Sequence, residues 1–303
     1  MRITNAQITA TMQGSMNRNS VELAKLMQQM ATNKRLQLPS DDPIASVRLL
    51  RIQRSEASLE QYQTNIGSLS SSLSMQETNL KSISDTLLSA RDRLLWAANG
   101  ANASEDLAAI AGELKIIESS ILSFANVRDE EGRYLFSGTL SDQPAISFDE
   151  ATGYQLGGND KQRQVVVANG VMVAENVTAS AVFGGTVGLL NQMRELVTTL
   201  QDPNLDSSDP QVGAAIRTAL DTLDSTHGRL LGSVTELGGR QNALTLLNDS
   251  NEDVSLVNQK VEGELSRVDY ASANIQFNDY LLAVQSTQKT YLKISELSLF
   301  NLL

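Results

Sequence analysis

A repeating pattern of apolar residues at positions 59–97 constrains the fold of this chain more than any other feature. Alternating steps of three and four residues, starting at Leu59, lead to twelve positions, of which ten are apolar. The two exceptions are Tyr62, which is amphipathic, and Gln76, which is polar. Such spacing places one side of an α-helix against partner helices along its whole length. The sequence therefore predicts a long helix from Pro43 to Ala97 that cannot bury its apolar side alone.

The same spacing returns after the turn at residues 99–102 and again in the C-terminal half of the chain, with an interruption near residues 202–210. The glycine pair Gly238-Gly239 predicts a kink or a phase shift in the last pattern. We call the buried apolar positions of these helices the bundle seam. The residues that we assign to the seam are Ile66, Leu69, Leu73, Leu80, Ile83, Leu87, Leu114, Ile117, Val261 and Val268.

The middle of the chain has a different character. Short apolar runs at 145–148, 164–167 and 171–173 are bounded by Gly, Asn and Asp, and Asn169-Gly170 is a hairpin signal. We expect a small β unit at 139–183, which should behave as a satellite of the helices. The predicted fold is mainly α: a long antiparallel heptad helical bundle built from both chain ends, with a small inserted β domain. Its predicted parts are terminal amphipathic helices at 1–42 and 276–303, a helical rod at 43–138 and 184–275, and the insert at 139–183.

A loop with two prolines precedes the long helix. Ser40, Asp41 and Asp42 are residue types that cap helix N-termini, and Pro43 suits a first helical turn. The two carboxylates also invite comparison with a metal site or an acid–base pair. Capping and the helix dipole already account for them, so we interpret the segment as a helix start.

Composition excludes several classes of function. The chain has no cysteine, which removes thiol nucleophiles, thiolate-bound metals and disulfides together. Its only histidine, His227, lies on the apolar pattern, where a structural role is expected. A net charge of −11 argues against a nucleic-acid partner. We find no run of ~20 apolar residues and no ordinary signal peptide. We expect neither an enzyme, nor a cofactor or metal, nor membrane insertion.

Both ends of the chain carry amphipathic segments of opposite charge. Residues 1–60 hold eight Lys and Arg against five Asp and Glu, a net charge of +3, whereas residues 241–303 hold four against eight, a net charge of −4. Because neither end can bury much alone, we expect the first ~30 and last ~25 residues to become ordered only on assembly. The residues that we assign to subunit assembly are Ile3, Ile8, Met12, Met16, Ile275, Leu282, Leu299, Phe300, Leu302 and Leu303.

Five short motifs, taken in order, resemble the flagellin superfamily, and together they span almost the whole chain. Asn33 stands where relatives usually have Gly before a Lys-Arg pair, and Asn also tolerates a left-handed backbone. The motifs are Met1-Arg2-Ile3-Thr4, Lys34-Arg35 followed by residues 39–43, residues 134–139, residues 237–242, and Ser298-Leu299-Phe300-Asn301.

This resemblance implies an assembly subunit that is exported unfolded by the flagellar type III route and built into a ring beneath the filament, outside the cell. Its implied partners are further copies of itself, a neighbouring hook-associated protein, flagellin, and an export chaperone on the C-terminal helices. The short insert favours a junction subunit between hook and filament over a flagellin with large outer domains. Two alternatives stay open: a flagellin-like filament subunit, and a coiled-coil adaptor or signalling protein, which explains the repeats but not the insert.

Overall fold

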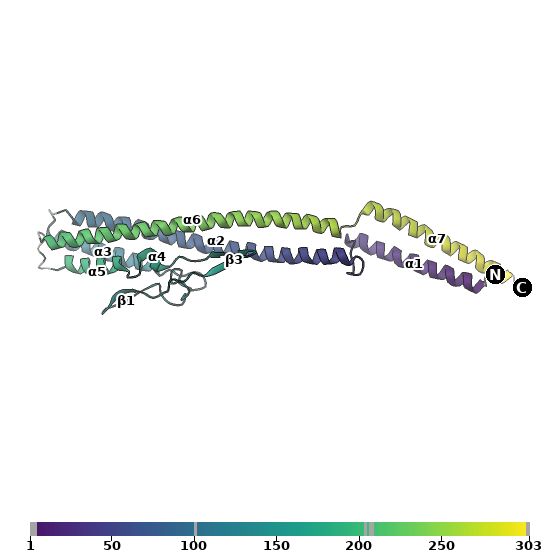
Figure 1. The fold of residues 1–303 in the computed structure, drawn as a ribbon, viewed down its shortest axis with the longest axis horizontal. Helices are drawn as coiled ribbons and strands as arrows, with labels where there is room; N and C mark the ends of the chain where they lie inside the picture. The colour runs from purple at the N-terminus through teal and green to yellow at the C-terminus, as the bar shows by residue number, and fades with distance from the viewer. Residues whose placement is uncertain (1–4, 100–101, 203–204, 206–208, 301–303) are drawn as a thin grey trace. The chain divides into compact units, whose positions relative to one another are not determined.

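The computed structural model describes residues 5–99, 102–202, 205 and 209–300, and of residues 5, 6 and 295–300 the backbone alone. The fold is mainly helical with a small antiparallel β region, which confirms the predicted class (Figure 1). The elements in chain order are α1 (Asn5–Thr32), α2 (Pro43–Ala97), α3 (Ser104–Ala125), β1 (Ile146–Asp149), β2 (Gly153–Leu156), β3 (Gln164–Ala168), β4 (Val171–Ala174), α4 (Ala179–Phe183), α5 (Gly188–Leu200), α6 (Pro210–Ser266) and α7 (Tyr270–Phe300).

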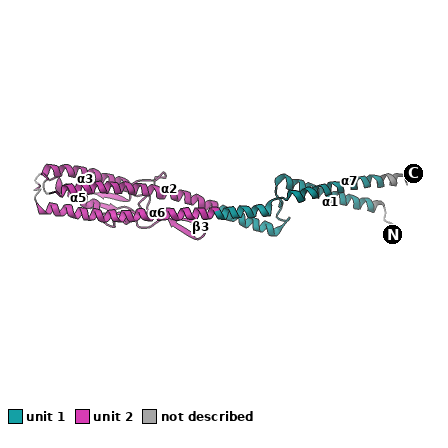
Figure 2. Ribbon diagram, turned by 90° about the horizontal axis from the view of Figure 1, so that it is seen from above, with its two compact units in different colours: residues 1–58, 253–303 teal, residues 59–252 magenta. Residues whose placement is uncertain are grey.

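The chain divides into two compact units, coloured separately in Figure 2. Unit 1 comprises residues 1–58 and 253–303, and therefore contains α1, α7 and the adjoining ends of α2 and α6. Unit 2 comprises residues 59–252 and contains the other helices and all of the strands named above. The finer division into terminal helices, rod and insert stays a prediction.

In unit 2, α2 carries a continuous stripe of buried side chains. Leu73, Leu80, Ile83 and Leu87 have no exposed surface, and Ile66 and Leu69 are also buried. Helix α3 contributes Leu114 to the same core, with Ile117 partly buried against it. Burying large aliphatic side chains at this spacing removes apolar surface from water along most of the helix, and this is the main favourable term in folding.

Helix α6 meets α2 with the opposite chain direction. Ser84 of α2 lies 2.9 Å from the imidazole Nε2 of His227, and Arg91 forms an ion pair of 3.0 Å with Asp224. His227 is only half-buried, and the fully buried position beside it belongs to Thr226. The single histidine therefore makes a structural contact between two helices.

The glycine pair in α6 does not cause the phase shift that the sequence suggested. α6 continues through Gly238 and Gly239 as one helix. Its buried residues keep a spacing of seven on both sides of the pair, so the phase of the stripe is unchanged. The residues with this spacing are Ile216, Leu223, Leu230, Leu237, Leu244 and Asn251.

The β region consists of two separate two-stranded antiparallel sheets, β1 with β2 and β3 with β4. The sequence predicted β1, β3 and β4 and the hairpin turn at Asn169-Gly170, but missed β2 and the short helix α4. β2 escaped notice because it begins at Gly153 and is followed by Gly157, and glycines at both ends of so short a segment indicate a turn. The register of the first sheet places Ile146 opposite Leu156 and Asp149 opposite Gly153.

The insert is not a satellite of the helices, and that expectation was wrong. Its buried side chains belong to the same apolar cluster as the seam residues of α2, α3 and α6. The glycines at its borders allow sharp turns, but they do not separate its core from the bundle. The shared residues are Ala145, Ile146, Tyr154, Val167, Val177, Ala179, Val182 and Phe183.

In unit 1, α1 and α7 pack against each other. Leu26 of α1 is buried with Val268 and Ala273 in a second, smaller apolar cluster, whereas Val261 of α6 is half-buried. The sequence did not predict the break at residues 267–269 that separates α6 from α7. Asp269 marks it, because its carboxylate accepts hydrogen bonds from the backbone N–H groups of Ala271 and Ser272, as an N-cap does.

Candidate assembly surfaces

The residues that the sequence assigned to assembly differ in exposure between the two terminal helices of unit 1. Ile8, Met12 and Met16 of α1 are half-buried, whereas Ile275 and Leu282 of α7 are 65% and 60% exposed. Ile3, Leu302 and Leu303 lie outside the described residues, and of Leu299 and Phe300 only the helical backbone is described. Among the described residues, these two apolar side chains of α7 are therefore exposed to water.

A small hollow of about 120 Å³ lies between α1 and α7. Met12 and Met16 line it from one side, and Thr287 and Tyr291 line it from the other. Flexible thioether side chains fill irregular gaps well and adapt to new neighbours. The hollow is too small for a drug-sized ligand, and its lining suits an apolar side chain of a packing partner.

The loop between α1 and α2 is fastened to the connection between α6 and α7. Asn33 has the left-handed φ of 53° that the sequence allowed for at this position. The N–H of Arg35 donates to the carbonyl of Ser266 at 2.7 Å, and its guanidinium donates to the carbonyl of Leu265 at 3.1 Å. The loop with the Lys-Arg pair therefore links the two chain ends within unit 1.

The residues expected to start α2 make different contacts, and among the two aspartates only Asp42 caps the helix. The carboxylate of Asp42 accepts a hydrogen bond from the N–H of Ala45 at 3.0 Å, which is the geometry of an N-cap before Pro43. Ser40 is exposed. Asp41 instead turns toward α1, where Lys25 binds its carboxylate at 2.8 Å.

Asp41 also holds the loop itself, because its second oxygen accepts hydrogen bonds of 3.0 Å from the N–H groups of Gln37 and Leu38. The Lys25 ammonium and these two backbone donors favour the charged form of the carboxyl group and lower the pKa of Asp41 to about 2. The carboxylate therefore joins helix α1 to the loop that leads into α2.

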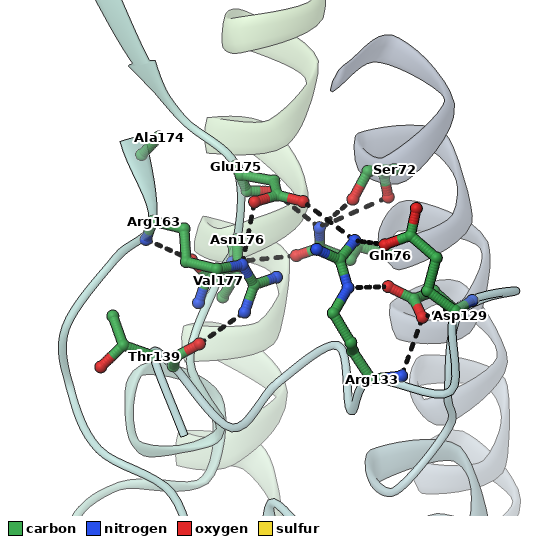
Figure 3. Close-up of polar contacts among 12 residues, drawn as sticks. Ser72, Gln76, Asp129, Arg133, Thr139, Arg163, Ala174, Glu175, Asn176 and Val177 are labelled. Atoms are coloured by element: carbon green, nitrogen blue, oxygen red, sulfur yellow. Dashed lines mark hydrogen bonds and ion pairs between the residues drawn. The ribbon is translucent and has the colours of Figure 1, made fainter. Parts of the chain in front are cut away.

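In unit 2, four polar side chains of α2 and α6 attach the insert through its backbone. Gln76, at a fully buried position of α2, accepts from the N–H of Val177 at 2.9 Å and donates to the carbonyl of Glu175 at 2.8 Å (Figure 3). Arg240 of α6 donates to the carbonyls of Ala174 and Asn176 at 3.1 and 3.3 Å. The segment 174–177 is therefore held from both long helices.

Side chains of α2 and α6 also bind the backbone of strand β3. Asn65 of α2 donates to the carbonyl of Val166 at 2.7 Å, and Asn251 of α6 donates to the carbonyl of Val167 at 3.3 Å. Sequence analysis found Gln76 as an irregularity and Arg240 as part of the motif at 237–242, but it gave no reason to select the two asparagines or to expect that these residues hold the insert. Their partners are carbonyl groups of distant segments, which no local sequence signal identifies.

A group of charged residues lies beside Gln76 at the edge of the insert. The Glu175 carboxylate binds the guanidinium of Arg163 at 2.8 Å and that of Arg133 at 3.7 Å, while Arg133 binds Asp129 at 2.8 Å (Figure 3). Burial alone would raise the pKa of Asp129, but hydrogen bonds from Arg133 outweigh it and the pKa is lowered. Each charge therefore has an opposite charge beside it, and the group serves to hold the insert.

The motif at 134–139 forms the entry to the insert. The hydroxyl of Ser137, which is fully buried, donates to the carbonyl of Gln143 at 2.6 Å. Gly138 has a φ of 72°, and a Cβ there would collide with the backbone oxygen of Asn159. Only glycine therefore allows this close approach without strain.

A buried tyrosine–glutamate pair joins the β1–β2 sheet to α3. The phenol of Tyr154 donates to the carboxylate of Glu118 at 2.5 Å, and Glu118 is only 5% exposed. Burial, and then the hydrogen bond to Glu118, raises the pKa of Tyr154 to about 12. Sequence reasoning missed this pair because a glutamate on a helix is ordinarily expected to face water and Tyr154 lies in the missed strand.

A membrane-spanning helix and a metal site each require features that the described residues lack. Among the residues that the structure describes, no helix is long and apolar enough to cross a membrane. The same part of the chain holds no group of three or more His, Cys, Asp and Glu side chains arranged to bind a metal ion. The polar groups described above act on the protein's own backbone and side chains.

Comparison with known proteins places the chain in a family. Residues 3–141 match the bacterial flagellin N-terminal helical region. The chain is 26% identical to flagellar hook-associated protein 3 of Salmonella typhimurium over 319 aligned positions, which cover 100% of this chain and 99% of that protein. It is 27% identical to flagellar hook-associated protein 3 of Escherichia coli, with 94% of each chain covered.

A solved structure supports the same relationship at higher identity. A protein of Vibrio parahaemolyticus described as a flagellar hook-associated protein is 38% identical, with a TM-score of 0.69. The alignment covers 75% of this chain and 100% of that one. The chain belongs to the flagellin superfamily and, within it, to the family of flagellar hook-associated protein 3.

Proposed function

We propose that this chain is a structural subunit of the bacterial flagellum that forms the junction between hook and filament. The observation that carries the proposal is the alignment over essentially its whole length with hook-associated protein 3 of two bacteria. Several motif residues fit this role, because Arg35, Asp42 and Arg240 make contacts that hold the fold together. No step of the proposed function requires a reaction or a cofactor.

The assembly region in this proposal consists of the terminal segments 1–42 and 276–303, which pack against neighbouring subunits in a ring. Leu282 of α7 supports it, since this large apolar side chain of the second segment is 60% exposed, and the exposed Ile275 lies just before that segment. Residues 43–138 and 184–275 would form the antiparallel heptad bundle, and residues 139–183 would form the insert. Neighbours in the flagellum would be another hook-associated protein and flagellin.

The route to the outside in this proposal is flagellar type III export, with a cytosolic chaperone on the C-terminal helices. The absence of cysteine suits a chain that passes unfolded from reducing to oxidising surroundings, because no wrong disulfide can form. The apolar residues of α7 are the part that a chaperone would need to cover before export.

Gold labelling of intact flagella from the source bacterium tests this function directly. Antibodies against the exposed insert should bind in a single band where the hook meets the filament. Labelling along the whole filament would indicate the alternative, a flagellin-like filament subunit. Labelling inside the cell alone would contradict a flagellar role and favour an adaptor protein.

A further inference from the structure

Within unit 1, one side of α2 faces away from the rest of that unit and combines apolar with positive side chains. We define the cationic face as Ile44, Val47, Leu50, Arg51 and Arg54, which fall within one arc of the helix, opposite the buried Ala45 and Ile52. Ile44 is 84% exposed, the highest value among the large apolar side chains that the structure describes. No part of the chain that the structure describes covers this face.

In the same unit, one side of α6 combines exposed apolar side chains with negative ones. We define the acidic face as Asp253, Leu256, Val257, Lys260 and Glu264, with Leu256 and Val257 67% and 60% exposed. It lies opposite the side of α6 that binds α2, where Ser255 donates to the carboxylate of Glu56 at 2.7 Å. Along the described chain, Arg51, Arg54, Asp253 and Glu264 make no ion pair. Both faces therefore have charges available for a partner.

The two faces cannot meet within one chain, because each lies on the outer side of its helix, away from the contact between α2 and α6. Charge also opposes a symmetric contact of the cationic face with its own copy, since that would place arginines against arginines. A contact between the cationic face of one copy and the acidic face of the next avoids this repulsion. Such a head-to-tail contact repeats from copy to copy and can close into a ring.

We propose that the cationic face of α2 and the acidic face of α6 form the lateral contact between adjacent copies of this chain. The inference rests on the proposed ring function and names the surfaces that build it. The apolar residues exclude water from the centre of the contact. The charges at its edge set the orientation and favour the correct partner more than they add affinity.

Charge reversal with rescue tests this contact in the source bacterium. Arg51→Glu with Arg54→Glu should cause filament protein to be shed into the medium, and so should Asp253→Arg with Glu264→Arg. Combining all four substitutions should restore filament retention, because the attraction returns with its signs exchanged. A matched control, Lys115→Glu with Arg217→Glu, reverses exposed charges outside both faces and should retain filaments. Unchanged retention in the two reversed pairs, or failure of the fourfold variant to restore it, would overturn the proposal.

Cross-linking gives a second readout that does not depend on charge. Because the natural chain has no cysteine, Leu50→Cys and Val257→Cys introduce the only thiols. In isolated flagella, the variant with both cysteines should give a ladder of multimers with a short bis-maleimide, and each single variant should stay monomeric. Multimers from a single variant would contradict the head-to-tail contact, and so would a monomer from the double variant. Absence of the chain from flagella in the gold-labelling experiment would instead refute the proposed function itself.

Discussion

The side-chain amide of Gln76 forms both a donor and an acceptor contact with the segment around Val177, across a hundred residues of sequence. Its oxygen accepts from the N–H of Val177 at 2.9 Å, and its nitrogen donates to the carbonyl of Glu175 at 2.8 Å. A polar residue at a fully buried position would ordinarily weaken a helix seam. Here it satisfies two backbone groups of the insert that have lost contact with water.

Replacing Gln76 by Leu should lower the free energy of unfolding by about 2–4 kcal/mol, because two buried backbone groups lose their partners. Chemical denaturation followed by helical circular dichroism measures this. Gln211→Leu is the control: Gln211 is exposed on α6, and its replacement should change stability by about 0.5 kcal/mol or less. Equal effects of the two substitutions would mean that the amide of Gln76 does not hold the insert.

The Tyr154–Glu118 pair offers a double-mutant cycle. Tyr154→Phe should destabilise the fold by about 1–3 kcal/mol, because it leaves a buried carboxylate without its hydrogen-bond donor. Adding Glu118→Leu should recover part of that loss, since an apolar pair has no such requirement. Strictly additive effects in thermal melts would show that the two side chains do not interact.

The contact between Asp41 and Lys25 predicts a dependence on acid pH. The pKa of Asp41 in the folded chain, about 2, lies below its ordinary value of 3.8. The stabilisation is therefore present above pH 3.8 and is lost as the pH falls through about 2. NMR titration of the amide signals of Gln37 and Leu38 should show that midpoint.

Asp41→Asn serves as the control for this titration. The variant keeps the shape of the side chain but has no carboxyl group to protonate, so the two amide signals should not move between pH 3.8 and 2. A midpoint near 3.8 in the natural chain would show that Asp41 is not bound to Lys25 in solution.

A charge at the bundle seam should be poorly tolerated. Leu73 has no exposed surface, so Leu73→Asp would bury a carboxylate without a partner and should cost about 3–5 kcal/mol. Its neighbour Ser74 is exposed, and Ser74→Asp should leave the melting temperature nearly unchanged. Similar melting temperatures for the two variants would place Leu73 outside the buried seam.

The sequence was most informative where structure follows from local periodicity and turn chemistry. The seam residues of α2, the Asp42-Pro43 helix start and the left-handed Asn33 could be predicted, because spacing, capping and backbone preference are local properties. The phase shift expected at the glycine pair of α6 was wrong, because glycine lowers helix stability but the buried residues keep their spacing of seven on both sides.

The parts that could not be predicted depend on contacts between distant segments. The most buried positions of α6 include Thr226 and Ser233, which an apolar pattern passes over. The attachment of the insert by Arg240 and Asn251 uses backbone carbonyls, which carry no sequence signal. The satellite hypothesis failed for the same reason, since glycine borders say nothing about whether two cores are shared.

The most direct test of the account is filament retention in the source bacterium. Deleting the gene for this chain should leave hooks without filaments and flagellin in the medium, and the full-length chain should restore attached filaments. A chain lacking residues 298–303 should melt like the natural chain but fail to restore them, because its assembly end is lost. If filaments stay attached when the chain is absent, it does not form the junction between hook and filament, and the central claim is wrong.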